Sequence, residues 1–504
     1  MRVLRLAGSL ALAAIALGVT LALCEVTARI VDGVPLLPLR LPPAPLAPLA
    51  PAKPVERIVD DEALPADVDP TWFDVSPPPT TRGPIDPDFL RKVQALRGTD
   101  IPAFNIFRVW NRRFVEKYAC TPGSLLQRLP QPLLVFDPPE PSETPPFRYP
   151  PSQTISGGLV TNRFGWRGPE IPLDKPAGTI RLAFVGASTT VGLYQLRFSY
   201  PEYVVHWLNL WAQRAALPVR FDGINAGREG ISSAVIAAVI RQELLPLEPD
   251  LVVYYEGANQ SLCVQHAPAA PPLQPPSAAW LQMNHIVGAM SDDSQIARRA
   301  AGMLQRLAVH DGFEPSKPKL ELGWWFPNGL DEAAPDIARL DLPAPERAIL
   351  ADLESARTTL ERSGSELALS SFAWLVFDGL RLDTRRHAAI YRHLNEGCWP
   401  YRYADLRRAV DLHNHILQRY ALAHGLPFVD VAAEFPPDQD LFFDAVHLND
   451  DGTRLHAWIV FRALLPLVRS KIEAGVWPRP DQVPQTDHPS ITAGEPYTVS
   501  CPTP

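Results

Sequence analysis

A serine stands where this sequence could place a nucleophile. Ser188 lies in the run GASTT at residues 186–190, directly after the apolar residues 180–185. A buried strand that ends on a tight turn of small residues exposes the next hydroxyl at the edge of a sheet. Alone, this pattern is more often a tight turn with a serine that caps the next helix than a catalytic site. A catalytic interpretation therefore depends on partners elsewhere in the chain.

Later segments carry the residue types that a nucleophilic serine needs. A serine hydroxyl must give its proton to a nearby base, and a third group must hold that base in the productive tautomer. His447 suits the base and Asp444, three residues earlier, suits the group that orients it. The backbone N–H groups of Ser188 and Gly230 and the side-chain amide of Asn259 could stabilise the oxyanion formed during attack.

These segments resemble the SGNH (GDSL-like) hydrolase family in its membrane-anchored bacterial type. The family has a serine turn, a glycine, a G-x-N loop and a terminal D-x-x-H. The resemblance covers residues 155–475, with a long interruption. It implies a set of roles in this chain: nucleophile Ser188, oxyanion donors Ser188, Gly230 and Asn259, base His447 and orienting carboxylate Asp444.

The chemistry implied by the resemblance is ester hydrolysis through an acyl-enzyme on Ser188. Two positions depart from the family pattern: Ala187 stands in place of the usual Asp, and Gln260 stands where Asp is frequent. Neither position holds a reacting group. A sugar hydroxyl could also discharge the acyl-enzyme, so an O-acyltransferase for envelope or exopolysaccharide is the first alternative. A catalytically silent glycan-binding or scaffold protein is the second.

The elements around these residues alternate as in a parallel α/β sheet. Strands are predicted near 180–186, 219–225, 250–256 and 426–431, and helices near 201–215, 232–244, 403–424 and 452–474. Ligands of such sheets sit at the carboxyl ends of the strands, where Ser188, Gly230 and Asn259 all fall. The resemblance implies a flavodoxin-like sheet sandwiched by helices. The sequence itself adds a long, mainly helical insertion within this fold and a transmembrane helix before it.

Helical patterns and cysteines mark the insertion, residues 263–400, as a lid. Its predicted helices are 294–310, 345–363 and 368–382. Cys263 and Cys398 flank it, and a disulfide between them would hold both of its ends. Together with Cys120 and Cys501, however, they allow three connectivities.

The N-terminus predicts a membrane anchor. Residues 6–24 are uncharged and long enough to cross a hydrocarbon core of about 30 Å. Arg2 and Arg5 precede this stretch and Glu25 follows it, so the positive-inside rule places everything after Cys24 outside the cytoplasm. A cleavable signal peptide is the alternative. We expect a single-pass protein of the cell membrane with a periplasmic catalytic domain.

Composition limits the remaining possibilities. A net charge of −8 over 504 residues, without a Lys/Arg-rich run, gives no support to nucleic-acid binding. The histidines have no metal-ligand spacing, so we predict neither metal nor cofactor. Many of the 56 prolines fall in two extended stretches. The predicted order is an anchor (1–24), a Pro-rich linker (25–85), a small pre-domain (86–154), the hydrolase core (155–262 and 401–476) around the insertion (263–400), and an extended tail (477–504).

Overall fold

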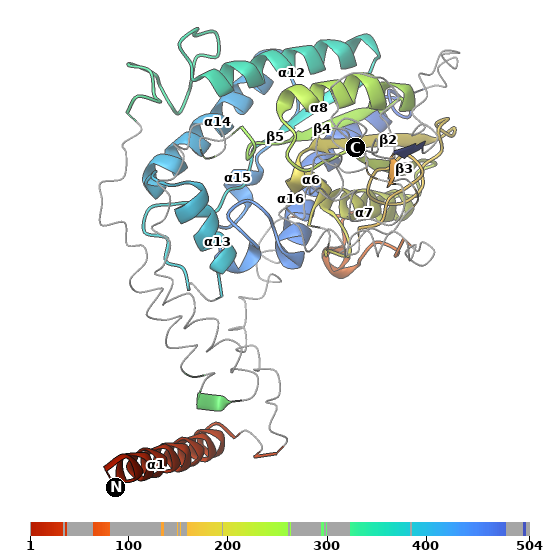
Figure 1. Cartoon of the computed structure of the whole chain (residues 1–504). Coiled ribbons are helices and arrows are strands. Elements are labelled where there is room, and N and C mark those ends of the chain that lie inside the picture. Colours follow the sequence, from red (N-terminus) through yellow and green to blue (C-terminus); the bar gives the residue numbers. More distant parts are fainter. Residues whose placement is uncertain are drawn as a thin grey trace. The chain divides into compact units, whose positions relative to one another are not determined.

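The computed structural model describes residues 2–33, 36–37, 64–80, 133–135, 149, 152, 159–193, 195–260, 263, 294–296, 299, 323–383, 386–479 and 497–499. The chain forms two compact units. One consists of Met1–Lys53 with Pro268–Lys319, and the other of Pro54–Ala267 with Leu320–Pro504. The second unit contains every residue given a catalytic role above, and Figure 1 shows its sheet and helices.

A five-stranded parallel sheet forms the centre of the second unit, with the strand order β3-β2-β4-β5-β6. The strands are β2 (Thr179–Gly186), β3 (Arg220–Asn225), β4 (Leu251–Tyr255), β5 (Glu366–Ser370) and β6 (Phe428–Val429). The chain steps from β2 to one edge and then crosses back to the other, which is the doubly wound order of flavodoxin-like folds. The predicted parallel α/β sheet is therefore confirmed.

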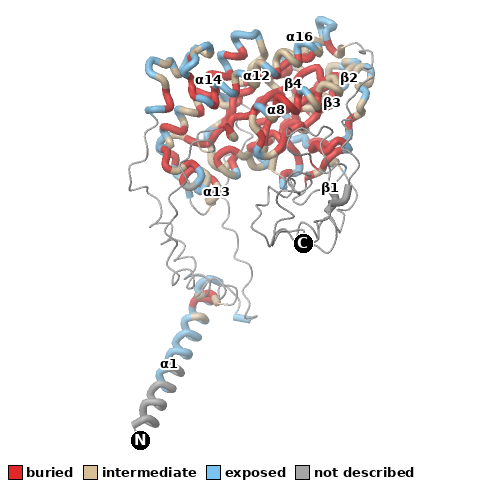
Figure 2. The backbone as a smooth tube through the Cα atoms, turned by 45° about the horizontal axis from the view of Figure 1, so that its top comes forward, coloured by how far each residue is buried: buried red, intermediate tan, exposed pale blue. Residues whose placement is uncertain are grey.

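Helices cover both faces of this sheet, so its strands are apolar on both sides. In β2, Leu182 and Phe184 belong to one core cluster, whereas Ala183 and Val185 belong to the other. This alternation follows from the two-residue period of a strand. Figure 2 shows that buried residues fill the interior of this unit, and every residue of β2 and β4 is buried.

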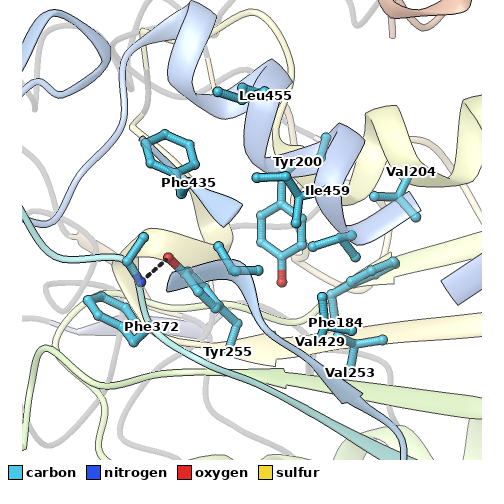
Figure 3. Close-up of a cluster of buried hydrophobic side chains, with 14 of the residues drawn as sticks. Phe184, Tyr200, Val204, Val253, Tyr255, Phe372, Val429, Phe435, Leu455 and Ile459 are labelled. Atoms are coloured by element: carbon cyan, nitrogen blue, oxygen red, sulfur yellow. Dashed lines mark hydrogen bonds between the residues drawn. The ribbon is translucent and has the colours of Figure 1, made fainter. Parts of the chain in front are cut away.

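On one face lie α7 (Tyr200–Arg214) and α16 (Asp450–Glu473). Figure 3 shows their Tyr200 and Ile459 side chains among Phe184 and Val253 of the strands. The other face is covered by α8 (Ser233–Val239), α12 (Ala344–Arg362) and the end of α14 (Tyr403–His424). Shorter helical elements complete the unit: η1 (Pro70–Asp74), α6 (Ser188–Val191), η5 (Ile240–Leu244), η6 (Leu245–Leu247), α13 (Ala388–Arg392), η7 (His393–Gly397), α15 (Val431–Glu434) and η8 (Gln439–Leu441).

Capping residues fix the helix ends that flank the site. Ser199 and Glu202 form a capping box at the start of α7. The side chain of Asn449 accepts a hydrogen bond from the backbone N–H of Gly452 at the start of α16, 3.0 Å away. This cap sets where α16 begins, directly after the loop that holds Asp444 and His447.

The segment 263–400 is not the helical insertion that we predicted. The region 368–382, predicted as a helix, begins inside strand β5, which pairs with both β4 and β6. An apolar run of this length fits a buried strand as well as a buried helix, and periodicity cannot separate them. Because α12 also packs on the sheet, residues 344–370 belong to the hydrolase core.

The first unit contains α1 (Arg2–Val31), which continues past the predicted end of the anchor at residue 24. The Glu25 carboxylate accepts a hydrogen bond from the backbone N–H of Gln295 at 2.7 Å, and Arg299 pairs with Asp32 at 2.5 Å. Part of the sequence between the oxyanion loop and α12 therefore packs against α1. Within the described part of the chain, no helix is both long and apolar enough to span a bilayer.

Part of the predicted linker is packed rather than extended. Phe73 is buried, stacks on Trp207 of α7 and meets Trp458 of α16 edge-on. Asp67 accepts a hydrogen bond from Trp211 Nε1 at 2.6 Å. Aromatic burial thus fixes residues 64–80 on the core despite their prolines.

The remaining predicted segments are only partly described. Most of the predicted pre-domain, residues 86–154, lies outside the described residues, and so does most of 294–310. Within the predicted tail, β7 (Tyr497–Val499) pairs antiparallel with β1 (Leu133–Val135).

Candidate active site

The nucleophile sits on a tight strand-to-helix turn. Ser188 is the first residue of α6, two residues after β2 ends. Two glycines allow this turn. A Cβ on Gly186 would lie 2.1 Å from Thr190 Oγ1, and a Cβ on Gly227 would lie 2.4 Å from the backbone nitrogen of Val191. Any larger residue at either position would displace the helix that carries Ser188.

Ser188, His447 and Asp444 form a connected triad. His447 Nε2 lies 2.8 Å from Ser188 Oγ, and His447 Nδ1 lies 2.8 Å from Asp444 Oδ2. The other oxygen of Asp444 accepts the backbone N–H groups of Val446 (2.9 Å) and His447 (2.8 Å). The loop after β6 therefore holds the carboxylate in place from its own backbone, and the carboxylate holds the imidazole.

Electrostatics suit His447 for base catalysis. Burial opposes the charge of Asp444, but the hydrogen bond and charge of His447 outweigh it and lower the pKa of Asp444 to about 2. Burial likewise opposes the imidazolium. The hydrogen bond and charge of Asp444, with smaller contributions from Glu229 and Glu256, nevertheless raise the pKa of His447. At neutral pH the carboxylate is therefore ionised and the imidazole is a strengthened base.

The predicted oxyanion donors follow three adjacent strands. Ser188 follows β2, Gly230 follows β3 with a φ of 66°, and Asn259 follows β4. Asn259 Nδ2 donates to the backbone oxygen of Ile231 at 3.0 Å, which links the second and third of these loops. An amide nitrogen carries two hydrogens, so this bond orients the side chain and leaves it able to donate to a substrate oxygen.

Sequence reasoning missed two side chains beside the triad. His393 Nδ1 lies 3.7 Å from Asp444 Oδ1. Burial lowers the pKa of His393, although the charge of Asp444 opposes this effect. Glu256 is completely buried between the nucleophile turn and the oxyanion loop. The only signal for Glu256 in the sequence is its position, directly after an apolar strand and directly before the G-x-N motif that ends at Asn259.

A disulfide joins Cys263 to Cys398, with their Cα atoms 4.5 Å apart. It ties the oxyanion loop to the end of η7, the segment that begins with His393. Cys120 and Cys501 lie outside the described residues.

The aromatic residues of the predicted lid differ in how far they are buried. Trp325 and Trp374 are buried and line a narrow crevice beside Gly257 and Gln260, whereas Trp324 is 60% exposed. The crevice borders the oxyanion loop, so part of this aromatic set lies next to the site. Among the described residues, no cluster of His, Cys, Asp or Glu could hold a metal ion.

The chain aligns in structure with several solved proteins, and this similarity concerns the fold. No family model and no curated protein matches the sequence. A GDSL-like lipase from Bacteroides thetaiotaomicron aligns at 13% identity over 58% of this chain and 88% of its own, with a TM-score of 0.27. The acetyl xylan esterase AlAXEase aligns at 13% over 57% and 100%, with a TM-score of 0.31.

A variant of an acetyl xylan esterase from Geobacillus stearothermophilus aligns at 16% identity over 57% of this chain and 93% of its own, with a TM-score of 0.29. At these scores, the assignment of chemistry rests on the distances within the site. The solved structures named above are GDSL-like lipases and acetyl xylan esterases. Independently of them, Ser188, His447 and Asp444 of this chain have the hydrogen-bonded arrangement of a serine-hydrolase triad.

Proposed function

We propose that this chain is a membrane-anchored, extracytoplasmic serine esterase of SGNH type that cleaves its substrate through an acyl-enzyme on Ser188. The single observation that carries the chemistry is the position of His447. Its Nε2 lies 2.8 Å from the Ser188 hydroxyl while its Nδ1 is held by Asp444. A silent scaffold has no need of this geometry, which favours an enzyme over that alternative.

Each proton transfer in the proposed reaction passes through His447. Ser188 Oγ attacks the ester carbonyl carbon as Nε2 takes its proton, and the oxyanion is stabilised by donors of the three loops. The tetrahedral intermediate collapses, and the departing alcohol takes the proton from Nε2. A water then attacks the Ser188 ester and gives a proton to Nε2. Ser188 leaves with that proton, and the carboxylic acid is released.

Covalent labelling tests this chemistry directly. A fluorophosphonate probe should label the purified protein, and p-nitrophenyl acetate should be hydrolysed. Both reactions should be lost in Ser188→Ala and His447→Ala, with the fold retained by circular dichroism. Labelling that persists in folded Ser188→Ala would refute the proposal. Product analysis with oligosaccharide acceptors separates hydrolysis from transfer, because free acid identifies a hydrolase and an acylated sugar identifies a transferase.

The proposed anchoring rests on the N-terminal sequence. Residues 6–24 carry no charge, and they lie within helix α1. Large apolar side chains of this helix, such as Leu12 and Leu23, are more than half exposed at 73% and 63%. Such a surface on a helix is costly in water and favourable in lipid.

Fractionation and reporter fusions test the anchoring. The full chain should fractionate with membranes, and alkaline phosphatase fused after Pro54 should be active only if that point lies outside the cytoplasm. An active cytoplasmic reporter at the same point would reverse the orientation. Recovery of the protein without its first 24 residues would identify a cleaved signal peptide instead.

A further inference from the structure

Glu256 bridges the two loops that carry the chemistry. It follows β4 directly, and its side chain has no exposed surface. Its Oε2 accepts the backbone N–H of Ala187 at 3.2 Å, and its Oε1 accepts the backbone N–H of Asn259 at 2.8 Å. One carboxylate therefore contacts the residue before the nucleophile and the backbone of the side-chain oxyanion donor.

The two hydrogen bonds of Glu256 connect the loops that follow the neighbouring strands β2 and β4. Gly186 at the end of β2 and Tyr255 at the end of β4 are register partners, so the two loops leave the sheet side by side. Beyond that pair the ladder stops. The side chain of Ala187 is a methyl group, which makes no hydrogen bond across this gap. Glu256 supplies the polar link from the opposite loop.

The ionised form of Glu256 is the one that fits these partners. Backbone N–H groups of Ala187 and Asn259, one on each oxygen, together with that of Gly257, favour a carboxylate, which accepts at both oxygens. Burial opposes the charge and raises the pKa of Glu256 to about 7, against the hydrogen bonds from Asn259 and Ala187. The residue is therefore poised to carry its charge in the range where His447 acts as a base.

The negative charge of Glu256 also interacts with the triad. Glu256 and His447 interact electrostatically, and each favours the charged form of the other. When Ser188 loses its proton, His447 becomes an imidazolium, and a second buried carboxylate besides Asp444 then favours that state. Tyr149 donates to Glu229, another nearby acidic group, and Arg228 forms a buried pair with Glu243.

We propose that Glu256 is a positioning residue of this active site: its buried carboxylate holds the Ser188 turn and the Asn259 loop in register. This inference rests on the proposed function. Glu256 does not touch the reacting atoms, so its effect should fall on the rate of the chemical step more than on substrate binding.

The test compares Glu256→Gln with Glu346→Gln. Glutamine has the size of glutamate, but one of the two accepting oxygens becomes an NH2 donor, which then faces the backbone N–H of Ala187 or Asn259. We expect kcat for p-nitrophenyl acetate to fall roughly tenfold to a hundredfold, with KM within threefold. Glu346 is a second buried glutamate, 4% exposed, whose pKa burial raises to about 8. Glu346 lines the crevice beside Gly257 and Gln260, so its substitution can change KM, but it should leave kcat within twofold.

The pH profile separates a catalytic role from a structural one. Loss of the Glu256 charge lowers the pKa of His447, so the acid limb of kcat/KM should move to lower pH in Glu256→Gln. Glu256→Asp keeps the charge but cannot span both loops, so it should lose rate without that movement of the limb. If Glu256→Gln does not fold, the kcat of Glu256→Asp tests the proposal in its place.

Two outcomes would overturn this inference. One is a Glu256 variant with wild-type kcat and an unmoved acid limb, even if its melting temperature is lower. The other is an equal loss of kcat in Glu346→Gln, which would assign the effect to buried carboxylates in general. If the wild-type protein is not labelled by the fluorophosphonate probe, the proposed esterase function fails instead.

Discussion

Replacing Asp444 by asparagine should disable the base while leaving its surroundings in place. The amide oxygen of the new side chain can still accept the backbone N–H groups of Val446 and His447, which in the native protein bond Asp444 Oδ1 at 2.9 and 2.8 Å. The amide NH2 group then faces His447 Nδ1. The imidazole will place its proton on Nε2 to accept that hydrogen bond, and Nε2 can then no longer receive the proton of Ser188.

The size of the effect follows from two losses. A charge-assisted hydrogen bond to the imidazolium contributes about 1.5–3 kcal/mol, and restoring the productive tautomer against a buried donor costs about 1–3 kcal/mol. Their sum, roughly 3–6 kcal/mol, corresponds to a fall in kcat of about 10²–10⁴-fold. KM should change little, because Asp444 lies behind the imidazole.

Steady-state hydrolysis of p-nitrophenyl acetate, with the fold checked by circular dichroism, measures this loss. Asp451→Asn serves as the matched control, because Asp451 is an exposed aspartate in the first turn of α16. A folded Asp444→Asn protein with kcat within threefold of wild type would refute the assignment of Asp444 as the group that orients His447.

Three further outcomes are expected. Asn259→Ala should lower kcat about 10²–10³-fold with KM within threefold, and an unchanged kcat would remove Asn259 from the oxyanion hole. Replacing Cys263 and Cys398 by Ser should lower the free energy of unfolding by roughly 2–5 kcal/mol, since the bridge joins residues 135 apart, and an unmoved urea midpoint would contradict this. Asp444 has a folded pKa lowered from 3.8 to about 2, so it stabilises the fold by about 2 kcal/mol above pH 4 and loses this as pH falls towards 2. Acid unfolding of Asp444→Asn should therefore be shallower over this range, and identical curves would contradict the shift.

Much of the sheet could be predicted from the sequence because its strands are short, apolar and followed by small residues. The predictions for β2, β3 and β4 agree with the structure to within a residue at either end. Strand β5 was missed because the chain leaves it through another apolar run, Ser371 to Val376, and this hides the strand end. The predicted boundaries of the lid were wrong for the same reason. The prediction placed no strand of the sheet between β4 and the helix that begins at Tyr403, whereas β5 lies there.

The reacting groups could be found from the sequence, but the groups around them could not. Ser188 and His447 carry chemistry that few other residue types can supply, so their motifs are visible. Glu256 acts through backbone N–H groups of two loops, and backbone donors leave no mark in a sequence. His393 meets Asp444 only because the chain folds back after β5, which is a contact between distant segments.

The distance along the chain between Ser188 and its base has a consequence for folding. The two residues are 259 positions apart, and strands β4, β5 and β6 must all pair before His447 reaches the hydroxyl. Such non-local pairing is slow to form. A chain in which these strands have not yet paired therefore has its Ser188 hydroxyl without the base, and it is inert as a hydrolase.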